Sequence, residues 1–278
     1  MSDANIIKKT DKKASGEIQA SVHSIIGHRE YQQDYAGLLV SNSRALAVVC
    51  DGMGGLNGGE RASQEAVKLL IDDYEREKPA EDFSGFLVRE ASRMDQLVFE
   101  MKSEDGDPLK AGSTVVAVIV EDGKLYWMSV GDSHIYVLRG DTMVPVTRDH
   151  NYRRDLEDAL SCGGISKEKY EREIHTRRAE ALTSYLGIGG LRKIEKNAKA
   201  FFLEDGDEVL LCSDGVYKSL DEHQIKAMLI DNRISVSVAV RRLVEMALMQ
   251  AVKSQDNTTA ILLRYNKLQT EDEHDALL

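Results

Sequence analysis

Short runs of Val, Ile and Leu recur along the chain and limit its possible folds more than any other pattern. Most are bounded by Gly, Asp or Asn, which is typical of β-strands. The predicted strands cover Ala20–Ile26, Ala36–Val40, Ala45–Cys50, Thr114–Glu121, Lys124–Val130, Ile135–Leu138, Glu208–Cys212 and Thr259–Tyr265. Several are only a few residues apart, and Asp122-Gly123 suits a two-residue hairpin turn. Strands joined so closely predict antiparallel sheet.

Apolar residues at helical spacing predict three long helices, over Glu60–Lys78, Phe83–Lys102 and Ser235–Lys253. The first two follow each other directly, so helices arrive in pairs and do not alternate with strands. This order lacks the regular βαβ alternation of a parallel sheet, and it therefore predicts an α+β fold.

We predict a single domain over residues 17–265. Residues 1–16 and 266–278 are polar and aperiodic, so we expect disordered tails, the second of them acidic. Three prolines in 278 residues, and no linker-like segment, give no sign of an internal boundary. Residues 148–190 are polar and contain a Cys-Gly-Gly break, which favours a mobile insertion. Its short helical patches are Arg153–Ala159 and Lys167–Glu173.

Composition excludes several classes of function. The chain has 36 Lys and Arg against 47 Asp and Glu, a net charge of −11, which disfavours nucleic acids and anionic membranes as partners. Its longest apolar runs span six residues, whereas a membrane helix needs about 20. Residues 1–13 lack the apolar stretch of a signal peptide. Three cysteines, two of them in apolar runs, indicate a reduced, cytoplasmic protein.

Aspartates stand at the ends of five predicted strands. Asp51, Asp132 and Asp214 follow apolar runs, while Asp34 and Asp256 precede them. One such residue alone is more typical of a turn or a helix cap. Five carboxylates brought to one place would repel one another unless cations lay among them. Oxygen ligands without His or Cys favour Mg²⁺ or Mn²⁺ over Zn²⁺.

These aspartates belong to a longer ordered set of motifs. The set comprises Arg29-Glu30-Tyr31-Gln32-Gln33-Asp34, Asp51-Gly52-Met53-Gly54-Gly55, Gly112-Ser113-Thr114, Val130-Gly131-Asp132-Ser133, Asp149-His150, Leu182-Thr183 with Leu186-Gly187, Ser213-Asp214-Gly215 and Asp256-Asn257. In this order the motifs resemble the metal-dependent protein phosphatases, the type 2C serine/threonine family, over roughly residues 20–265. The Met in D-G-M-G-G resembles the bacterial branch. The resemblance implies a four-layer α-β-β-α sandwich of two mainly antiparallel sheets flanked by helix pairs.

The resemblance also implies a metal centre with two or three Mn²⁺ or Mg²⁺ ions. Asp51 would bridge two ions, and the Gly52 carbonyl would bind one of them. Asp34, Asp214 and Asp256 would complete the ligand set, in part through water. The two ions would activate a bridging water for in-line attack on the phosphomonoester, without a covalent enzyme intermediate.

Further site residues follow from the same resemblance. Asp132 would hold a third, weaker metal together with Asp214, and Arg29 would bind the substrate phosphate. Residues at about 150–190 fall where the family has its flap. The chain departs from the family at Gln32-Gln33, where Asn-Gln or Asn-Glu is common. It also has Met53 where eukaryotic members often have a His proposed as general acid.

The expected enzyme is therefore a protein-serine/threonine phosphatase that acts on phosphorylated proteins, as a monomer, and opposes a kinase. The alternative is a non-catalytic binding or regulatory module with the same fold; loss of metal carboxylates would mark such a module, and here all five are present. A weaker alternative is nucleotide binding by the glycines of residues 54–59 at a helix N-terminus.

Overall fold

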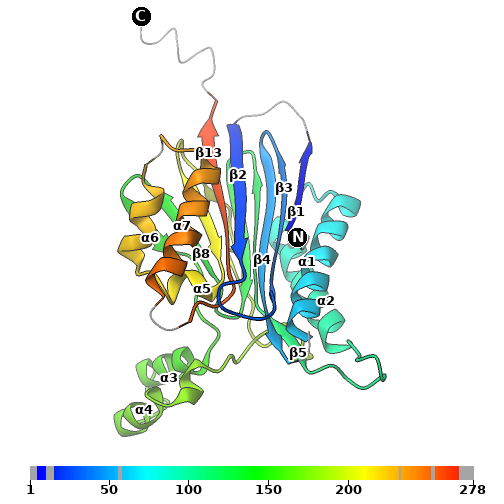
Figure 1. The fold of residues 1–278 in the computed structure, drawn as a ribbon, viewed down its shortest axis with the longest axis vertical. Helices are drawn as coiled ribbons and strands as arrows, with labels where there is room; N and C mark the ends of the chain where they lie inside the picture. Colours follow the sequence, from blue (N-terminus) through cyan, green and yellow to red (C-terminus); the bar gives the residue numbers. More distant parts are fainter. Residues whose placement is uncertain (1–4, 11–15, 56–57, 232, 252–253, 269–278) are drawn as a thin grey trace, which may run out of the picture.

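The computed structural model describes residues 5–10, 16–55, 58–231, 233–251 and 254–268. Two β-sheets pack face to face, and helices cover the outer face of each (Figure 1). This arrangement confirms the predicted α+β class and the four-layer α-β-β-α sandwich of mainly antiparallel sheets.

The first sheet has eight strands, and all its strand pairs are antiparallel except β1–β3. The order along the sheet is β1-β3-β4-β6-β7-β10, with β5 paired to β4 and β11 to β7. The strands are β1 (Asn5–Thr10), β3 (Asp34–Ser41), β4 (Arg44–Gly54), β5 (Ala111–Ser113), β6 (Val115–Glu121), β7 (Lys124–Val130), β10 (Glu195–Lys196) and β11 (Phe201–Phe202).

The second sheet has five strands in the order β2-β13-β12-β8-β9, all antiparallel. They are β2 (Gly16–Ile25), β8 (His134–Arg139), β9 (Thr142–Pro145), β12 (Glu208–Cys212) and β13 (Thr258–Lys267). The long pairing of β2 with β13 joins the two ends of the domain, so segments more than 200 residues apart in sequence lie side by side.

Paired helices form the two outer layers. α1 (Gly58–Glu77) and α2 (Phe83–Phe99) cover the first sheet, while α6 (Glu222–Leu229) and α7 (Val236–Gln250) cover the second (Figure 1). The sequence analysis did not single out α6, which begins with a capping box between Asp221 and Gln224. None of the helices in the described part of the chain has the length and apolar character of a membrane span.

The strands in the middle of the sheets are buried on both faces. In β4, Leu46 and Val48 pack beneath α1 and α2, whereas Ala47 and Val49 face the second sheet. In the second sheet, Leu211 faces inward and Leu210 faces α6 and α7. Successive side chains of a strand alternate between faces, so burial of both faces requires an unbroken apolar run. This explains why the strand signal in the sequence is so clear.

The first 16 residues do not all form the predicted tail. Asn5–Thr10 form β1, which pairs in parallel with β3, and Gly16 begins β2. The outer edge of β3 presents backbone N–H and C=O groups that a polar segment can pair without an apolar pattern of its own. At the other end, β13 continues to Lys267. The rest of the predicted tails, residues 1–4, 11–15 and 269–278, lies outside the described residues.

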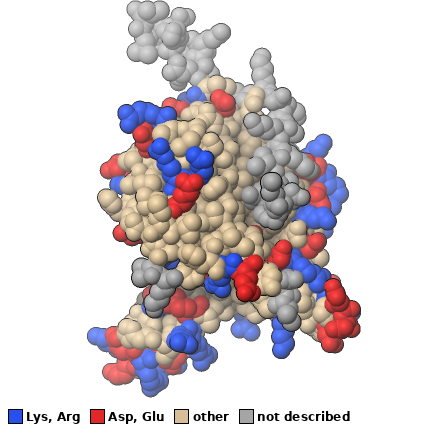
Figure 2. All heavy atoms as spheres, in the orientation of Figure 1, with Lys and Arg blue, Asp and Glu red and all other residues tan. Residues whose placement is uncertain are grey.

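The polar segment at 150–190, here called the flap, projects from the sandwich (Figure 1). It contains α3 (Tyr152–Ser161) and α4 (Lys167–Ile174), at the positions of the predicted helical patches. Acidic and basic side chains are interspersed over this lobe (Figure 2). Within it, the Tyr152 hydroxyl donates to Glu173 at 2.6 Å. The flap's few buried apolar residues include Leu156, Ile174 and Ala179.

Truncating Ile261 tests the packing between the sheets. Its side chain is fully buried between them, so Ile261→Ala should lower the free energy of unfolding by about 2–5 kcal/mol. Met249 in α7 is 70% exposed, so Met249→Ala should change the free energy of unfolding by less than about 0.5 kcal/mol. Denaturant unfolding measures both; equal losses would contradict the described packing.

Candidate active site

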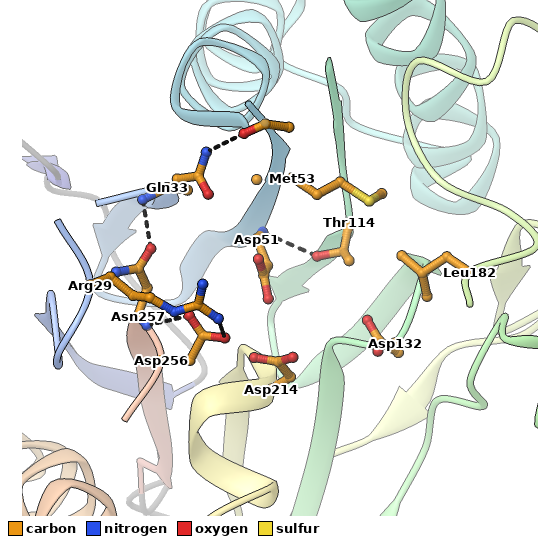
Figure 3. Close-up of a pocket in the computed structure, with 12 residues that line it drawn as sticks. Arg29, Gln33, Asp51, Met53, Thr114, Asp132, Leu182, Asp214, Asp256 and Asn257 are labelled. Carbon is orange, nitrogen blue, oxygen red and sulfur yellow. Dashed lines mark hydrogen bonds and ion pairs between the residues drawn. The ribbon is translucent and has the colours of Figure 1, made fainter. Parts of the chain in front are cut away.

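A pocket of about 270 Å³ opens at the end of the sandwich where the aspartate-bearing strand ends meet (Figure 3). Six of the seven predicted site residues line it, and the seventh, Asp34, lies beside it. The lining residues are Arg29, Gln33, Asp51, Gly52, Met53, Gly54, Thr114, Asp132, Leu182, Asp214, Asp256 and Asn257. The structure therefore brings together, from distant parts of the sequence, the residues that the motifs suggested.

Strand pairing places two carboxylates of the site next to each other. Asp34 in β3 is directly opposite Asp51 in β4. The backbone N–H of Asp51 donates to the Thr114 hydroxyl at 3.1 Å, and its carbonyl accepts from the Thr114 N–H at 2.8 Å. The Ser113 hydroxyl also donates to that carbonyl, at 3.0 Å. The backbone of Asp51 is therefore fixed by two neighbouring residues.

Asp34 is only partly satisfied within the chain. Its Oδ2 accepts from the Ser213 hydroxyl at 2.7 Å, but its Oδ1 is buried without a hydrogen-bond partner. Burial, with a smaller contribution from the charges of Asp214 and Asp256, raises the pKa of Asp34 to about 7, although the hydroxyl groups of Ser213 and Thr259 oppose this shift. An unpartnered carboxylate oxygen in such a place fits a cation ligand.

The neighbouring carboxylates are perturbed in the same direction. Burial and then the charge of Asp34 raise the pKa of Asp51 well above its usual range. Burial and then Asp214 raise the pKa of Asp132 to about 6. The pocket lining includes no His or Cys, so its donor set is made of oxygens. Such a set suits Mg²⁺ or Mn²⁺, whose positive charge would relieve the repulsion.

Two of the carboxylates are already paired with cationic side chains of the chain itself. Arg29 Nη2 lies 2.6 Å from Asp256 Oδ2, and Lys218 Nζ forms an ion pair with Asp214 Oδ2. In this conformation, no three His, Cys, Asp or Glu side chains among the described residues are grouped to hold a metal ion. Metal binding therefore requires some of the site's side chains to move closer to a common point.

Gly52 is required by the crowding of the backbone around it. A Cβ at this position would collide with the carbonyl oxygen of Gly59 at the start of α1, and would lie 2.6 Å from that of Gln33. Gly52 also donates its N–H to the Gln33 carbonyl at 3.0 Å. Close approach alone therefore accounts for a glycine here, whether or not its carbonyl binds a metal.

Asn257 lines the pocket and holds its edge together through bonds that the motifs did not predict. Its Nδ2 donates to the carbonyls of Ile26 and Tyr31 at 2.8 and 3.0 Å, and its Oδ1 accepts from the Gln33 N–H at 2.8 Å. These three bonds hold the loop that carries Arg29. The available signal was the pair Asp256-Asn257 directly before a strand, where an Asn side chain commonly bonds backbone groups.

Asp149 and His134 form a polar contact beside the pocket. His134 Nε2 lies 2.8 Å from Asp149 Oδ1, and its Nδ1 lies 2.8 Å from the Tyr136 hydroxyl. Helix α3 is capped by Asn151, whose side chain accepts from the Arg154 N–H. The contact of His134 with Asp149 joins two different parts of the chain, so spacing alone could not reveal it.

A carboxylate-lined pocket with one arginine, at the end of a double-sheet sandwich, suits divalent cations and a phosphate group. The family model described as Protein phosphatase 2C matches residues 23–253. The chain therefore belongs to the protein phosphatase 2C family, and it is a metal-dependent protein phosphatase of the bacterial type.

Individual relatives agree with this assignment. The serine/threonine phosphatase stp of Listeria welshimeri is 28% identical over 245 residues, which cover 87% of this chain and 93% of that protein. The phosphatase MsPP of Mycobacterium smegmatis, solved with cacodylate, is 29% identical with a TM-score of 0.65, covering 88% and 97% of the two chains. The catalytic domain of PstP, solved with two manganese ions, shares the fold at 22% identity, with a TM-score of 0.69 and coverage of 90% and 98%.

The raised pKa of Asp34 gives the metal-free protein a characteristic pH dependence. Between its ordinary value of 3.8 and about 7, the folded state holds a proton that the unfolded state releases. In chelator, Asp34 therefore lowers the stability of the protein as pH rises from 3.8 to about 7. Asp34→Asn removes the titrating group, so the loss of stability over this pH range should be smaller in the variant. Unfolding temperature against pH measures it, with the exposed Asp105→Asn as control. An unchanged pH profile in Asp34→Asn would contradict the electrostatic description.

Proposed function

We propose that this phosphatase removes phosphate from phosphoserine and phosphothreonine in proteins, using two Mn²⁺ or Mg²⁺ ions in the pocket described above. Asp51 would lie between the two ions, with Asp34, Asp214, Asp256 and the Gly52 carbonyl as the remaining ligands. The observation that carries the proposal is the convergence of four aspartates on one pocket, with Asp34 beside it and its Oδ1 buried and unpartnered.

When bound, two such ions supply an activated water and compensate negative charge on the phosphate. The chain's own residues bind and orient the phosphate. The guanidinium of Arg29 is more than half exposed and lies at the pocket, so it can turn from Asp256 and donate two hydrogen bonds to phosphate oxygens. Asn257 positions the loop that carries Arg29. Met53, also in the lining, has no proton to give to a leaving group.

The partners of the enzyme follow from its proposed reaction. Its substrates would be phosphorylated proteins, and a kinase would oppose it. The flap at 150–190 supports this in one respect, since Leu182 at its end lines the pocket and could touch a bound phosphoprotein. A monomeric state and a cytoplasmic location stay predictions from the sequence.

Loss of the bridging carboxylate should abolish the activity. Asp51→Asn keeps the side chain's size but removes its charge, so hydrolysis of a phosphothreonine peptide in Mn²⁺ should fall by at least about 10³-fold. Circular dichroism and unfolding temperature show whether the variant is folded. Activity near the wild-type level in Asp51→Asn, or full wild-type activity in excess chelator, would contradict the metal mechanism. A folded wild type without activity in Mn²⁺ would favour the non-catalytic alternative.

Arg29 should act on the substrate and not on the metals. Arg29→Ala removes a bidentate guanidinium contact of roughly 1.5–3 kcal/mol, so kcat/KM should fall by about 10- to 100-fold, mainly through KM. Arg29→Lys keeps the positive charge but cannot donate two parallel hydrogen bonds, so its kcat/KM should lie between those of the wild type and Arg29→Ala. Arg233→Ala, which removes an exposed arginine paired with Asp231, is the matched control. Unaltered steady-state kinetics in Arg29→Ala would remove Arg29 from the site.

A further inference from the structure

Lys218 is a cationic residue at the pocket that neither the sequence analysis nor the proposed mechanism uses. It follows the four-residue helix α5 (Asp214–Tyr217), and its Nζ forms an ion pair with Asp214 Oδ2. The side chain of Lys218 is 54% exposed, whereas that of Asp214 is 14% exposed. The ammonium group therefore reaches inward from the surface to a largely buried carboxylate.

The ammonium interacts with more than one carboxylate. Although burial opposes it, the negative charges of Asp214, Asp132 and Asp51 raise the pKa of Lys218. In the other direction, the charge of Lys218 opposes the upward shift that burial and Asp214 impose on the pKa of Asp132. Lys218 thus places a positive charge beside Asp214 and near Asp132. Arg29 pairs with Asp256 on another side of the pocket (Figure 3).

The position of Lys218 is set by the packing of the residue before it. The ring of Tyr217 stacks on His134, with 3.9 Å between centroids and 14° between planes. His134 is itself held by Asp149 and Tyr136. The Lys218 N–H also donates to the Asp214 carbonyl at 2.9 Å. These contacts hold the backbone at Tyr217 and Lys218, and the i,i+4 spacing places the Lys218 side chain within reach of the Asp214 carboxylate.

A cation shared by Asp132 and Asp214 would compete with this lysine. It would need carboxylate oxygen from Asp214, of which Oδ2 is paired with Lys218, and it would lie close to a like charge. We propose that Lys218 supplies the positive charge on this side of the pocket in place of a third metal ion. This inference rests on the proposed two-metal site, to which Asp214 would contribute Oδ1.

Counting bound metal tests the proposal without reference to activity. Mn²⁺ binding to the full chain is measured by equilibrium dialysis and calorimetry for the wild type, Lys218→Met and Lys218→Arg. We expect two ions on the wild type and on Lys218→Arg, and a third on Lys218→Met that binds at least about tenfold tighter than any third ion on the wild type. Lys226→Met, which removes a lysine paired with Asp141, is the matched control and should bind two.

A second measurement does not depend on metal. In chelator, Lys218→Met leaves the carboxylates of Asp132 and Asp214 without their cation, so its unfolding temperature should fall below that of Lys218→Arg. Equal Mn²⁺ stoichiometry and affinity in Lys218→Met and the wild type would overturn the proposal and leave the two-metal site intact. A wild type that binds no Mn²⁺ would overturn the two-metal site, and this inference with it.

Discussion

Mutual repulsion among buried carboxylates is the constraint that the rest of the structure must satisfy. Asp34 and Asp51 are neighbours across two paired strands, and Asp214 and Asp256 reach the same place from the second sheet. The carboxylates themselves oppose this arrangement, because like charges repel one another. The surrounding sandwich holds them together, because its strands are buried on both faces and their ends are fixed by backbone pairing.

The chain compensates only part of this charge itself. Arg29 pairs with Asp256, Lys218 pairs with Asp214, and Ser213 donates to Asp34, but one oxygen of Asp34 keeps no partner. The remaining negative charge favours divalent cations, which are also what the hydrolysis of a phosphomonoester requires. The same excess of negative charge therefore contributes both to the raised pKa values of the carboxylates in the metal-free pocket and to the proposed chemistry.

The sequence predicted the parts of the fold whose physical cause is local. Strands such as β4 and β6 are unbroken apolar runs because both faces are buried, and α1 and α2 show one apolar face each. β1 has no such pattern, since it pairs through its backbone with the edge of β3. In the site, the aspartates at strand ends were visible. The bonds of Asn257 were not, because they depend on tertiary contacts that spacing does not encode. The ion pair of Lys218 with Asp214 has the i,i+4 spacing of neighbours on a helix, so the sequence did carry a signal for it.

The central claim is that two divalent ions at these aspartates are what make the protein a phosphatase. The most direct measurement titrates Mn²⁺ into chelator-treated, then desalted, protein while bound metal and phosphothreonine-peptide hydrolysis are followed in the same sample. The account predicts negligible turnover with one ion bound per chain and full turnover as the second binds. Full activity at one ion per chain, or before any metal is bound, would contradict it.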